Sequence, residues 1–128
     1  MLPARYRLRK MKDVERVSRK GRPAFVSVFT LRYAKNDLDH IRMTAVAGLK
    51  VHKRSVRRNR VKRLIREAFR REFLDRVTPG YDIVIYAKKD LVGKTYADVA
   101  TELGVALRKA GLLMQPPRNH GAKPANGT

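Results

Sequence analysis

Residues 57–71 read RRNRVKRLIREAFRR, a stretch with eight arginines and lysines and a single acid, Glu67. A helix advances about 100° per residue, so this stretch can be divided into two sides. One side is apolar and contains Val61, Leu64, Ile65 and Ala68, with Phe69 and Phe73 at its edge. The opposite side contains Asn59, Lys62, Arg63, Arg66 and Arg70, flanked by Arg58 and Arg60. The pattern predicts a helix that packs one side on a core and presents a row of cations on the other.

The row of cations has two interpretations. A charged face that is only solvated is the usual one, but such faces mix positive and negative residues to limit repulsion, and this face does not. We therefore favour a surface that a polyanion neutralises, and nucleic acid is the polyanion that the pattern indicates. Arg57 and Arg71 lie at the edges of the face, so we expect them to contribute less to binding than Arg60 and Arg66.

Composition supports a small, strongly basic folded protein. The chain has 128 residues, a hydrophobic fraction of 43% and a formal net charge of +20, which is enough chain for one domain with a core. The charge is concentrated, because residues 50–71 hold eleven basic groups and one acid. Residues 1–22 hold nine basic groups and two acids.

Cysteine is absent, which excludes disulfides and thiolate metal sites and favours a reducing cytoplasm. No apolar run approaches the roughly 18 residues that a membrane span needs. The basic N-terminus, MLPARYRLRKMK, is not followed by an apolar stretch of signal-peptide length. We therefore expect a cytoplasmic protein with no membrane partner.

The remaining patterns predict an α+β fold, with helices packed on a small sheet. The predicted elements are a helix at 11–20, strands at 25–34 and 41–49, the basic helix ending near 75, a strand at 81–88, and a helix from 95 or 96 that ends at 111. An extra strand near 49–52 is a further option. Thr95 and Asp98 resemble a capping box at the start of the last helix. Residues 114–128 are rich in Pro, Asn, Gly, Lys and Ala, which predicts a disordered tail after a domain at 1–113.

The segment RNRVKRLIRE, residues 58–67, resembles the RNR signature of the bacterial ribonuclease P protein subunit. Agreement extends to RLRK at 7–10, to YDIVIYAKK at 81–89, and to the ends of the first and last helices at Lys20-Gly21 and at 109–111. The resemblance covers roughly residues 5–113.

The resemblance implies an α-β-β-β-α-β-α sandwich with a four-stranded sheet and a left-handed βαβ crossover, which is a rare connection. It also implies a function. The family's holoenzyme removes the 5′ leader from precursor tRNA, and its RNA subunit carries out the hydrolysis with Mg²⁺ that is bound mainly by that RNA. The implied partners are ribonuclease P RNA, with one protein per RNA, and precursor tRNA, and no DNA is expected. No catalytic residue is expected in this chain.

The resemblance also assigns two sets of residues. The set expected to bind the catalytic RNA is Lys50, Lys53, Arg54, Arg58, Asn59, Arg60, Lys62, Arg63 and Arg66. The set expected to line a cleft for the leader, between the first helix and the sheet, is Arg9, Val14, Ser18, Arg32 and Lys88. The family usually places aromatic residues where Val14 and Ser18 stand here. Because neither side chain stacks well on a base, we expect a leader grip that relies more on charge, with Arg32 as a partial substitute.

Two other classes of function were considered. An autonomous nuclease needs clustered carboxylates or histidines, but the acids here are scattered and the three histidines lack the spacing of metal ligands. We therefore expect neither catalytic nor metal-binding residues. The alternative, a ribosomal protein or another structural RNA-binding module, is compatible with charge and fold class and differs only in lacking the RNR motif.

Overall fold

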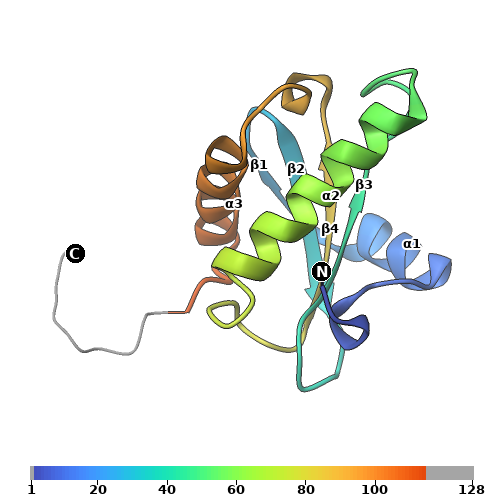
Figure 1. Ribbon diagram of the computed structural model, residues 1–128. Coiled ribbons are helices and arrows are strands. Elements are labelled where there is room, and N and C mark those ends of the chain that lie inside the picture. Colours follow the sequence, from blue (N-terminus) through green and yellow to red (C-terminus); the bar gives the residue numbers. More distant parts are fainter. Residues whose placement is uncertain (1, 115–128) are drawn as a thin grey trace, which may run out of the picture.

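The computed structural model of the chain describes residues 2–114. Its elements are η1 (Ala4–Tyr6), α1 (Met11–Lys20), β1 (Arg22–Phe25), β2 (Phe29–Lys35), β3 (Arg42–Val46), α2 (Ser55–Glu72), β4 (Tyr81–Ala87), η2 (Lys89–Leu91) and α3 (Tyr96–Ala110) (Figure 1). Apart from the short 3-10 turns η1 and η2, this is the α-β-β-β-α-β-α order that the resemblance implied. Among these residues, no helix combines the length and the apolar character that a membrane span needs.

The four strands form one sheet in the order β1-β2-β4-β3. β2 is antiparallel to both β1 and β4, whereas β3 and β4 are parallel and are joined through α2. In Figure 1, α2 lies in front of the sheet, both parallel strands run upward, and β4 lies to the left of β3. The β3-α2-β4 connection is therefore left-handed, in agreement with the resemblance.

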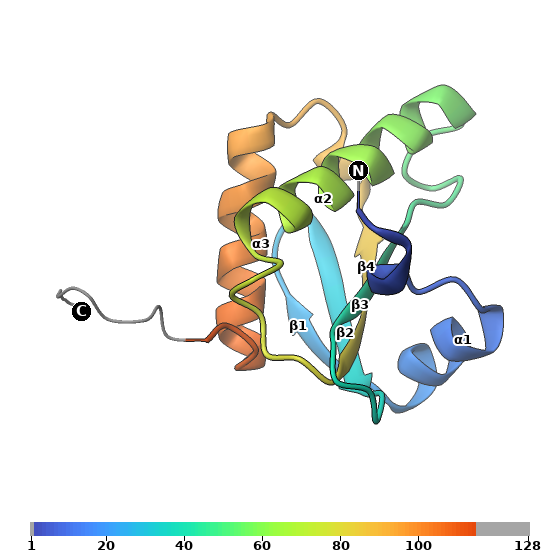
Figure 2. The same ribbon diagram turned by 60° about the horizontal axis from the view of Figure 1, so that its bottom comes forward.

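Helices cover both faces of the sheet, with α2 and α3 on one face and α1 on the other (Figures 1 and 2). Side chains alternate along β4, since Ile83 and Ile85 join the main core beneath α2 and α3 while Val84 packs against Val17 of α1. The apolar run at 81–88 is accordingly a buried strand, as predicted.

Helix α2 confirms the predicted division into two sides. Val61, Ile65, Ala68 and Phe69 are buried, and Leu64 is partly buried against the same core. Phe69 is fully buried, so it lies at the centre of the packed side and not at its edge. The helix begins at Ser55 and ends at Glu72, a little earlier at both ends than predicted.

The prediction of an extra strand near 49–52 was wrong, since these residues form a turn in which the amide of Val51 donates to the carbonyl of Gly48. The fourth strand is β1, which precedes β2 and contains Pro23. Proline has no N–H to donate to a neighbouring strand, but β1 lies at the sheet edge, where this loss is tolerated. The predicted strand at 25–34 is consequently divided by a turn between Phe25 and Phe29.

Helix α3 carries the predicted capping box, in which Thr95 and Asp98 exchange hydrogen bonds of 3.1 Å. It ends at Gly111, whose φ of 74° is one that glycine adopts without strain. The predicted tail begins at Met114, whose amide donates to the carbonyl of Arg76 at 2.7 Å. The rest of that prediction, residues 115–128, lies outside the described residues.

A glycine of α3 lies against the ring of Phe73, the residue that follows α2. Gly104 is buried in α3, and a Cβ at this position would lie 3.4 Å from Cζ of Phe73. Gly104→Leu should place branched carbons against that ring and lower the free energy of unfolding by about 1–3 kcal/mol. Chemical denaturation of the full chain measures this effect.

Gly104→Ala is the matched control. Its single methyl group makes an ordinary contact, and alanine favours a helix over glycine by about 1 kcal/mol. The alanine variant should therefore be as stable as the parent chain or more so. Equal losses in both variants would show that the Phe73 contact does not limit the helix packing.

Candidate nucleic-acid interface

The N-terminus of α2 concentrates positive charge without any internal compensation. Its N-cap, Arg54, makes no side-chain hydrogen bond to the first turn, and the first turn contains no acid. Cations at a helix N-terminus oppose the helix dipole, so this arrangement destabilises the isolated helix. An anion bound there would be attracted by both the free N–H groups and the side chains.

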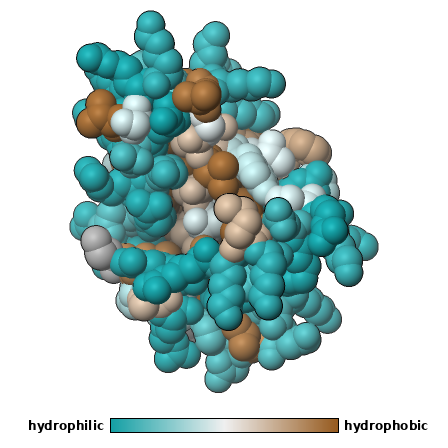
Figure 3. All heavy atoms as spheres, turned by 90° about the vertical axis from the view of Figure 1, so that its right-hand side faces the viewer, coloured by the Kyte–Doolittle hydropathy of each residue, from teal (hydrophilic) through white to brown (hydrophobic). Residues whose placement is uncertain are grey.

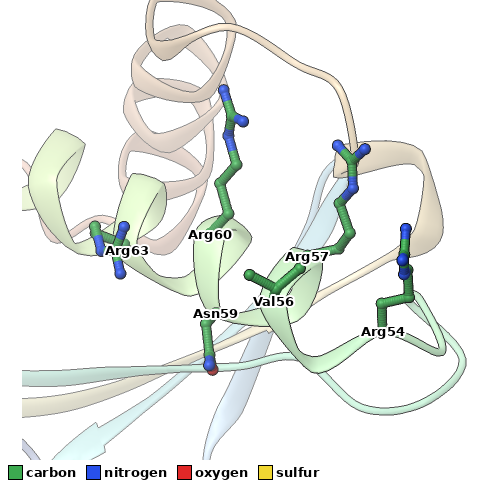
Figure 4. A pocket seen from close by; sticks show the side chains of 6 residues that line it. All are labelled: Arg54, Val56, Arg57, Asn59, Arg60 and Arg63. Atoms are coloured by element: carbon green, nitrogen blue, oxygen red, sulfur yellow. The ribbon is translucent and has the colours of Figure 1, made fainter.

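The outer surface of the first turns of α2 is hollowed. A cavity of about 580 Å³ is lined by Arg54, Val56, Arg57, Asn59, Arg60 and Arg63 (Figure 4). Figure 4 shows Arg57 and Arg60 extending to one side of the helix and Asn59 extending to the other. Val56 is 68% exposed, so an apolar side chain lies among these cations.

One predicted RNA contact has a structural role. Nη1 of Arg58 donates to the carbonyl oxygens of His52 and Lys53, each at 2.9 Å. The amide of Arg54 also donates to Nδ1 of His52 at 3.0 Å. These bonds hold the connector between β3 and α2 against the helix, and they leave the side chains of Lys50 and Lys53 exposed.

A second hollow, which we call the arginine hollow, lies where α2 meets the N-terminal segment. It has a volume of about 320 Å³ and is lined by Leu2, Arg7, Leu8, Arg9, Met43, Thr44 and Arg66. Among the described residues, no carboxylate lines the arginine hollow. The pKa of Arg66 is lowered, first by burial and then by the neighbouring charges of Arg7 and Arg63. This repulsion is what a bound phosphate would relieve.

Three of the residues predicted for the leader cleft lie together where α1 packs on the sheet. Val14 packs in a small cluster with Tyr86, and the hydroxyl of Ser18 is hydrogen-bonded to the hydroxyl of Tyr86. Arg32 lies on the same sheet face, and its Nη1 donates to the carbonyl of Gly21 at 2.9 Å. This bond ties the guanidinium to the end of α1 and limits its freedom to stack on a base.

The other two predicted cleft residues lie elsewhere. Arg9 lines the arginine hollow with Arg66. Lys88 follows β4, and its Nζ donates to the carbonyl of Val26 at 3.2 Å, in the turn between β1 and β2. The structure therefore divides the predicted cleft set into a group under α1 and two outlying cations.

Tyr86 is an aromatic residue that the sequence interpretation missed. Its ring is half-buried beneath α1, and its pKa is raised by burial, with the charge of Arg32 acting in the opposite sense. The signal was present, because alternation along YDIVIYA places Tyr86 on the same sheet face as Val84. The sheet thus supplies an aromatic surface where α1 lacks one.

Asp82 was missed as well. Its side chain is fully buried and accepts hydrogen bonds from Arg16 at 2.5 Å, from Asn36 at 2.9 Å, and from Nε and Nη2 of Arg42 at 2.8 and 2.7 Å. Hydrogen bonding to Asp82 is the main cause of a raised pKa at Arg42. Because Arg16 belongs to α1 and Arg42 to β3, this carboxylate fixes the helix on the sheet.

Seen from the side of α1 and β3, the molecule shows a strip of apolar side chains enclosed by hydrophilic ones (Figure 3). The cluster between α1 and the sheet includes the partly buried side chains of Val14, Val46 and Tyr86. Arg66 lies on α2. Surfaces for single-stranded nucleic acid combine stacking or apolar side chains with nearby cations, and Arg32 lies on this sheet face.

The geometry agrees with what comparison with known proteins shows. The Ribonuclease P family model matches residues 2–111, which is most of the chain. The chain belongs to the ribonuclease P protein family. This family membership makes it a protein subunit of an endoribonuclease whose partner is ribonuclease P RNA, and it sets aside the alternative of a ribosomal protein.

Individual relatives support the family assignment. The ribonuclease P protein component of Syntrophus aciditrophicus is 42% identical over 103 residues, covering 80% of this chain and 85% of that protein. A Clostridium botulinum counterpart is 35% identical over 106 residues, covering 83% and 95%. Among solved structures, the ribonuclease P protein from Staphylococcus aureus matches with a TM-score of 0.75 at 27% identity, over 84% of this chain and 97% of that one. The protein from Thermotoga maritima matches with a TM-score of 0.70 at 30% identity, over 80% and 96%.

Proposed function

We propose that α2 and the connector before it bind the catalytic RNA subunit, and that the sheet face beneath α1 holds the single-stranded 5′ leader of precursor tRNA. In this role the protein assists removal of the leader, and the hydrolysis takes place on the RNA. The supporting observation is the first half of α2, where exposed arginines, an uncapped helix N-terminus and the absence of any acid in the first turn coincide.

The chemistry of this surface favours phosphates of folded RNA. A guanidinium is a planar fork that can donate to two phosphate oxygens at once, and Asn59 can donate to a phosphate or accept from a 2′-hydroxyl. Folded RNA brings phosphates of separate strands together, so a cationic face lowers their mutual repulsion. Binding of this kind strengthens as salt is lowered, because each contact releases counterions.

Magnesium belongs to the RNA in this proposal. Within residues 2–114, no group of three or more His, Cys, Asp or Glu side chains gathers in a way that could hold a metal ion. The chain's contribution is to bind and orient the two RNAs, while Mg²⁺ supplies Lewis-acid chemistry where the RNA coordinates it.

Reconstitution tests the proposal. The full chain is mixed with a bacterial ribonuclease P RNA and with a precursor tRNA, and cleavage is followed as Mg²⁺ is titrated, with each component omitted in turn. We expect the chain to lower the Mg²⁺ needed for cleavage and to have no activity alone. Cleavage by the chain without RNA, or binding to the RNA no tighter than to an unrelated polyanion, would contradict the proposal.

Tyr86 should contribute specifically to binding of the leader. Tyr86→Leu removes an aromatic surface, and a stacked base is worth about 1–3 kcal/mol. We expect the affinity of the holoenzyme for precursor tRNA to fall while its affinity for mature tRNA stays unchanged. Equilibrium binding of both tRNAs at several salt concentrations measures the difference.

Tyr86→Phe is the control, since it keeps the ring and removes only the hydrogen bond to Ser18. It should retain the preference for precursor tRNA. If the leucine variant keeps that preference and the preference depends only on salt, the grip on the leader is electrostatic, as the sequence predicted.

A further inference from the structure

A groove on the flank of α2 that faces α3 shares Arg57 and Arg60 with the cavity at the helix N-terminus and extends the proposed RNA-binding surface toward Lys94. It lies between α2 and the connection from β4 to α3, has a volume of about 150 Å³, and is lined by Arg57, Arg60, Val61, Leu64, Leu91, Val92, Gly93 and Lys94. We call it the lateral groove. The arginine hollow with Arg66 is lined by the N-terminal segment and β3, so the two lie on different flanks of the helix.

The floor of the lateral groove is apolar. Val61 and Leu91 are buried in the core, and Leu64 and Val92 pack partly against it. Opposite α2, the connection turns at Gly93 with a φ of 85°, and no heavy atom lies within 4 Å of the position that a Cβ would take there. No other side chain of residues 2–114 therefore occupies the space beside Gly93.

The rim of the lateral groove is cationic. Arg57 and Arg60 extend to the same side of α2 (Figure 4), and Lys94 lines the groove from the connection between β4 and α3. In the part of the chain that the structure describes, no carboxylate lines the groove. Within residues 2–114, neither Arg57 nor Arg60 has a side-chain hydrogen bond or an ion pair. Two acids lie close along the chain. Asp90 is exposed and does not line the groove. Asp98 is engaged in the capping box of α3, and the charge of Lys94 contributes to lowering its pKa.

We propose that the lateral groove binds one unpaired nucleotide of the RNA subunit, with the base on the apolar floor and the phosphate between the rim cations. This inference rests on the proposed function. An A-form duplex offers side chains its phosphates and 2′-hydroxyls but not the faces of its bases, so a duplex uses the rim and leaves the floor empty. An unstacked nucleotide uses both, because its base can pack on aliphatic carbons and its phosphate can accept from arginine and lysine.

The groove also changes the expectation for Arg57. From sequence it lay at the edge of the basic face, where it was expected to contribute little. In the fold it shares a rim with Lys94, a residue 37 positions later in the chain. Helix α2 then contacts RNA along both flanks, and the nucleotide in the groove fixes its rotation on the RNA surface.

The test uses the full chain reconstituted with a bacterial ribonuclease P RNA. Lys94→Ala and Arg57→Ala should each weaken binding to the RNA about tenfold. Lys89→Ala is the matched control, because Lys89 is an exposed cation of the same connection that does not line the groove. Val92→Ser tests the floor without changing any charge, and thermal unfolding confirms that each variant folds.

Chemical probing of the RNA separates base insertion from simple attraction. In the parent complex, one unpaired nucleotide should be protected by the protein, and it should become reactive in the Lys94, Arg57 and Val92 variants but not in the Lys89 variant. The inference would be overturned if the groove variants lost no more RNA affinity than Lys89→Ala. It would also be overturned if they lost affinity while the reactivity of every unpaired nucleotide stayed the same. If the parent chain does not bind the RNA at all, the proposed function itself has failed.

Discussion

Asp82→Asn is expected to lower the free energy of unfolding by about 3 kcal/mol or more. Asp82 is fully buried, and both of its carboxylate oxygens accept hydrogen bonds from arginine. Asparagine has the same shape, but its amide nitrogen would face donors. Arg16 and Arg42 would then share a single partly exposed counter-charge, Asp13, at 4.0 and 3.7 Å. Urea or guanidinium denaturation followed by circular dichroism measures the loss.

Asp75→Asn is the matched control for that experiment. Asp75 is exposed and undergoes the same change of charge, so the altered net charge is common to both variants. In a chain with a formal net charge of +20, removal of any acid adds some repulsion, and the control measures it. A loss at Asp82 no greater than the loss at Asp75 would show that the buried network contributes little to folding.

Asp82→Asn should also change the binding of RNA. Arg16 links Asp82 to α1. Helix α1, which carries Val14 and Ser18, forms one wall of the proposed leader site. If Asp82→Asn is examined at a temperature where it remains folded, its affinity for precursor tRNA should fall more than its affinity for the RNA subunit, because the α2 surface lies on the other face of the sheet.

Arg66→Met is expected to weaken binding to ribonuclease P RNA about tenfold and to make the dependence of affinity on salt shallower by about one unit. Arg66 is half-buried in the arginine hollow, where its charge is opposed by Arg7 and Arg63. Methionine keeps the packing of the aliphatic stem while removing the charge. Stability should therefore stay the same or rise, which separates a loss of binding from a loss of folding.

Arg71→Met provides the comparison for Arg66→Met. Arg71 lies on α2 as well, but near its C-terminal end, where its guanidinium is 5.8 Å from the ring centroid of Tyr96. Arg71→Met should therefore reduce the affinity of the chain for RNA much less than Arg66→Met does. Equal losses at both positions would indicate diffuse attraction between the chain and RNA and would contradict a defined phosphate site at the arginine hollow.

The basic helix could be predicted from sequence because its signal is local. The helical period places Val61 and Ile65 on one side and Arg63 and Arg66 on the other, whatever the rest of the chain does. The capping box at Thr95 and the stop at Gly111 are local for the same reason, since their hydrogen bonds join residues a few positions apart. The RNR motif lies within this helix, so the family was evident as well.

Strand β1 could not be predicted in the same way. Residues 22–25 contain Pro23 and are short, so their pattern alone does not indicate a strand, and only pairing with β2 makes them one. Alternation along β4 placed Asp82, Val84 and Tyr86 on one face, but the apolar run did not indicate which helix would cover that face. A strand covered on both faces lacks the alternation of polar and apolar residues that reveals which face is which.

Sequence by itself determined that this protein carries a two-sided cationic helix, has an α+β fold, and belongs to a family that works with RNA. Tertiary structure alone decided how the charges are grouped: Arg58 holds the connector, Arg9 joins Arg66, and Arg57 joins Lys94. The physical reason is the range of the interactions. Helix periodicity and capping depend on residues within one or two turns, whereas a binding site is made from side chains that only the folded chain brings together.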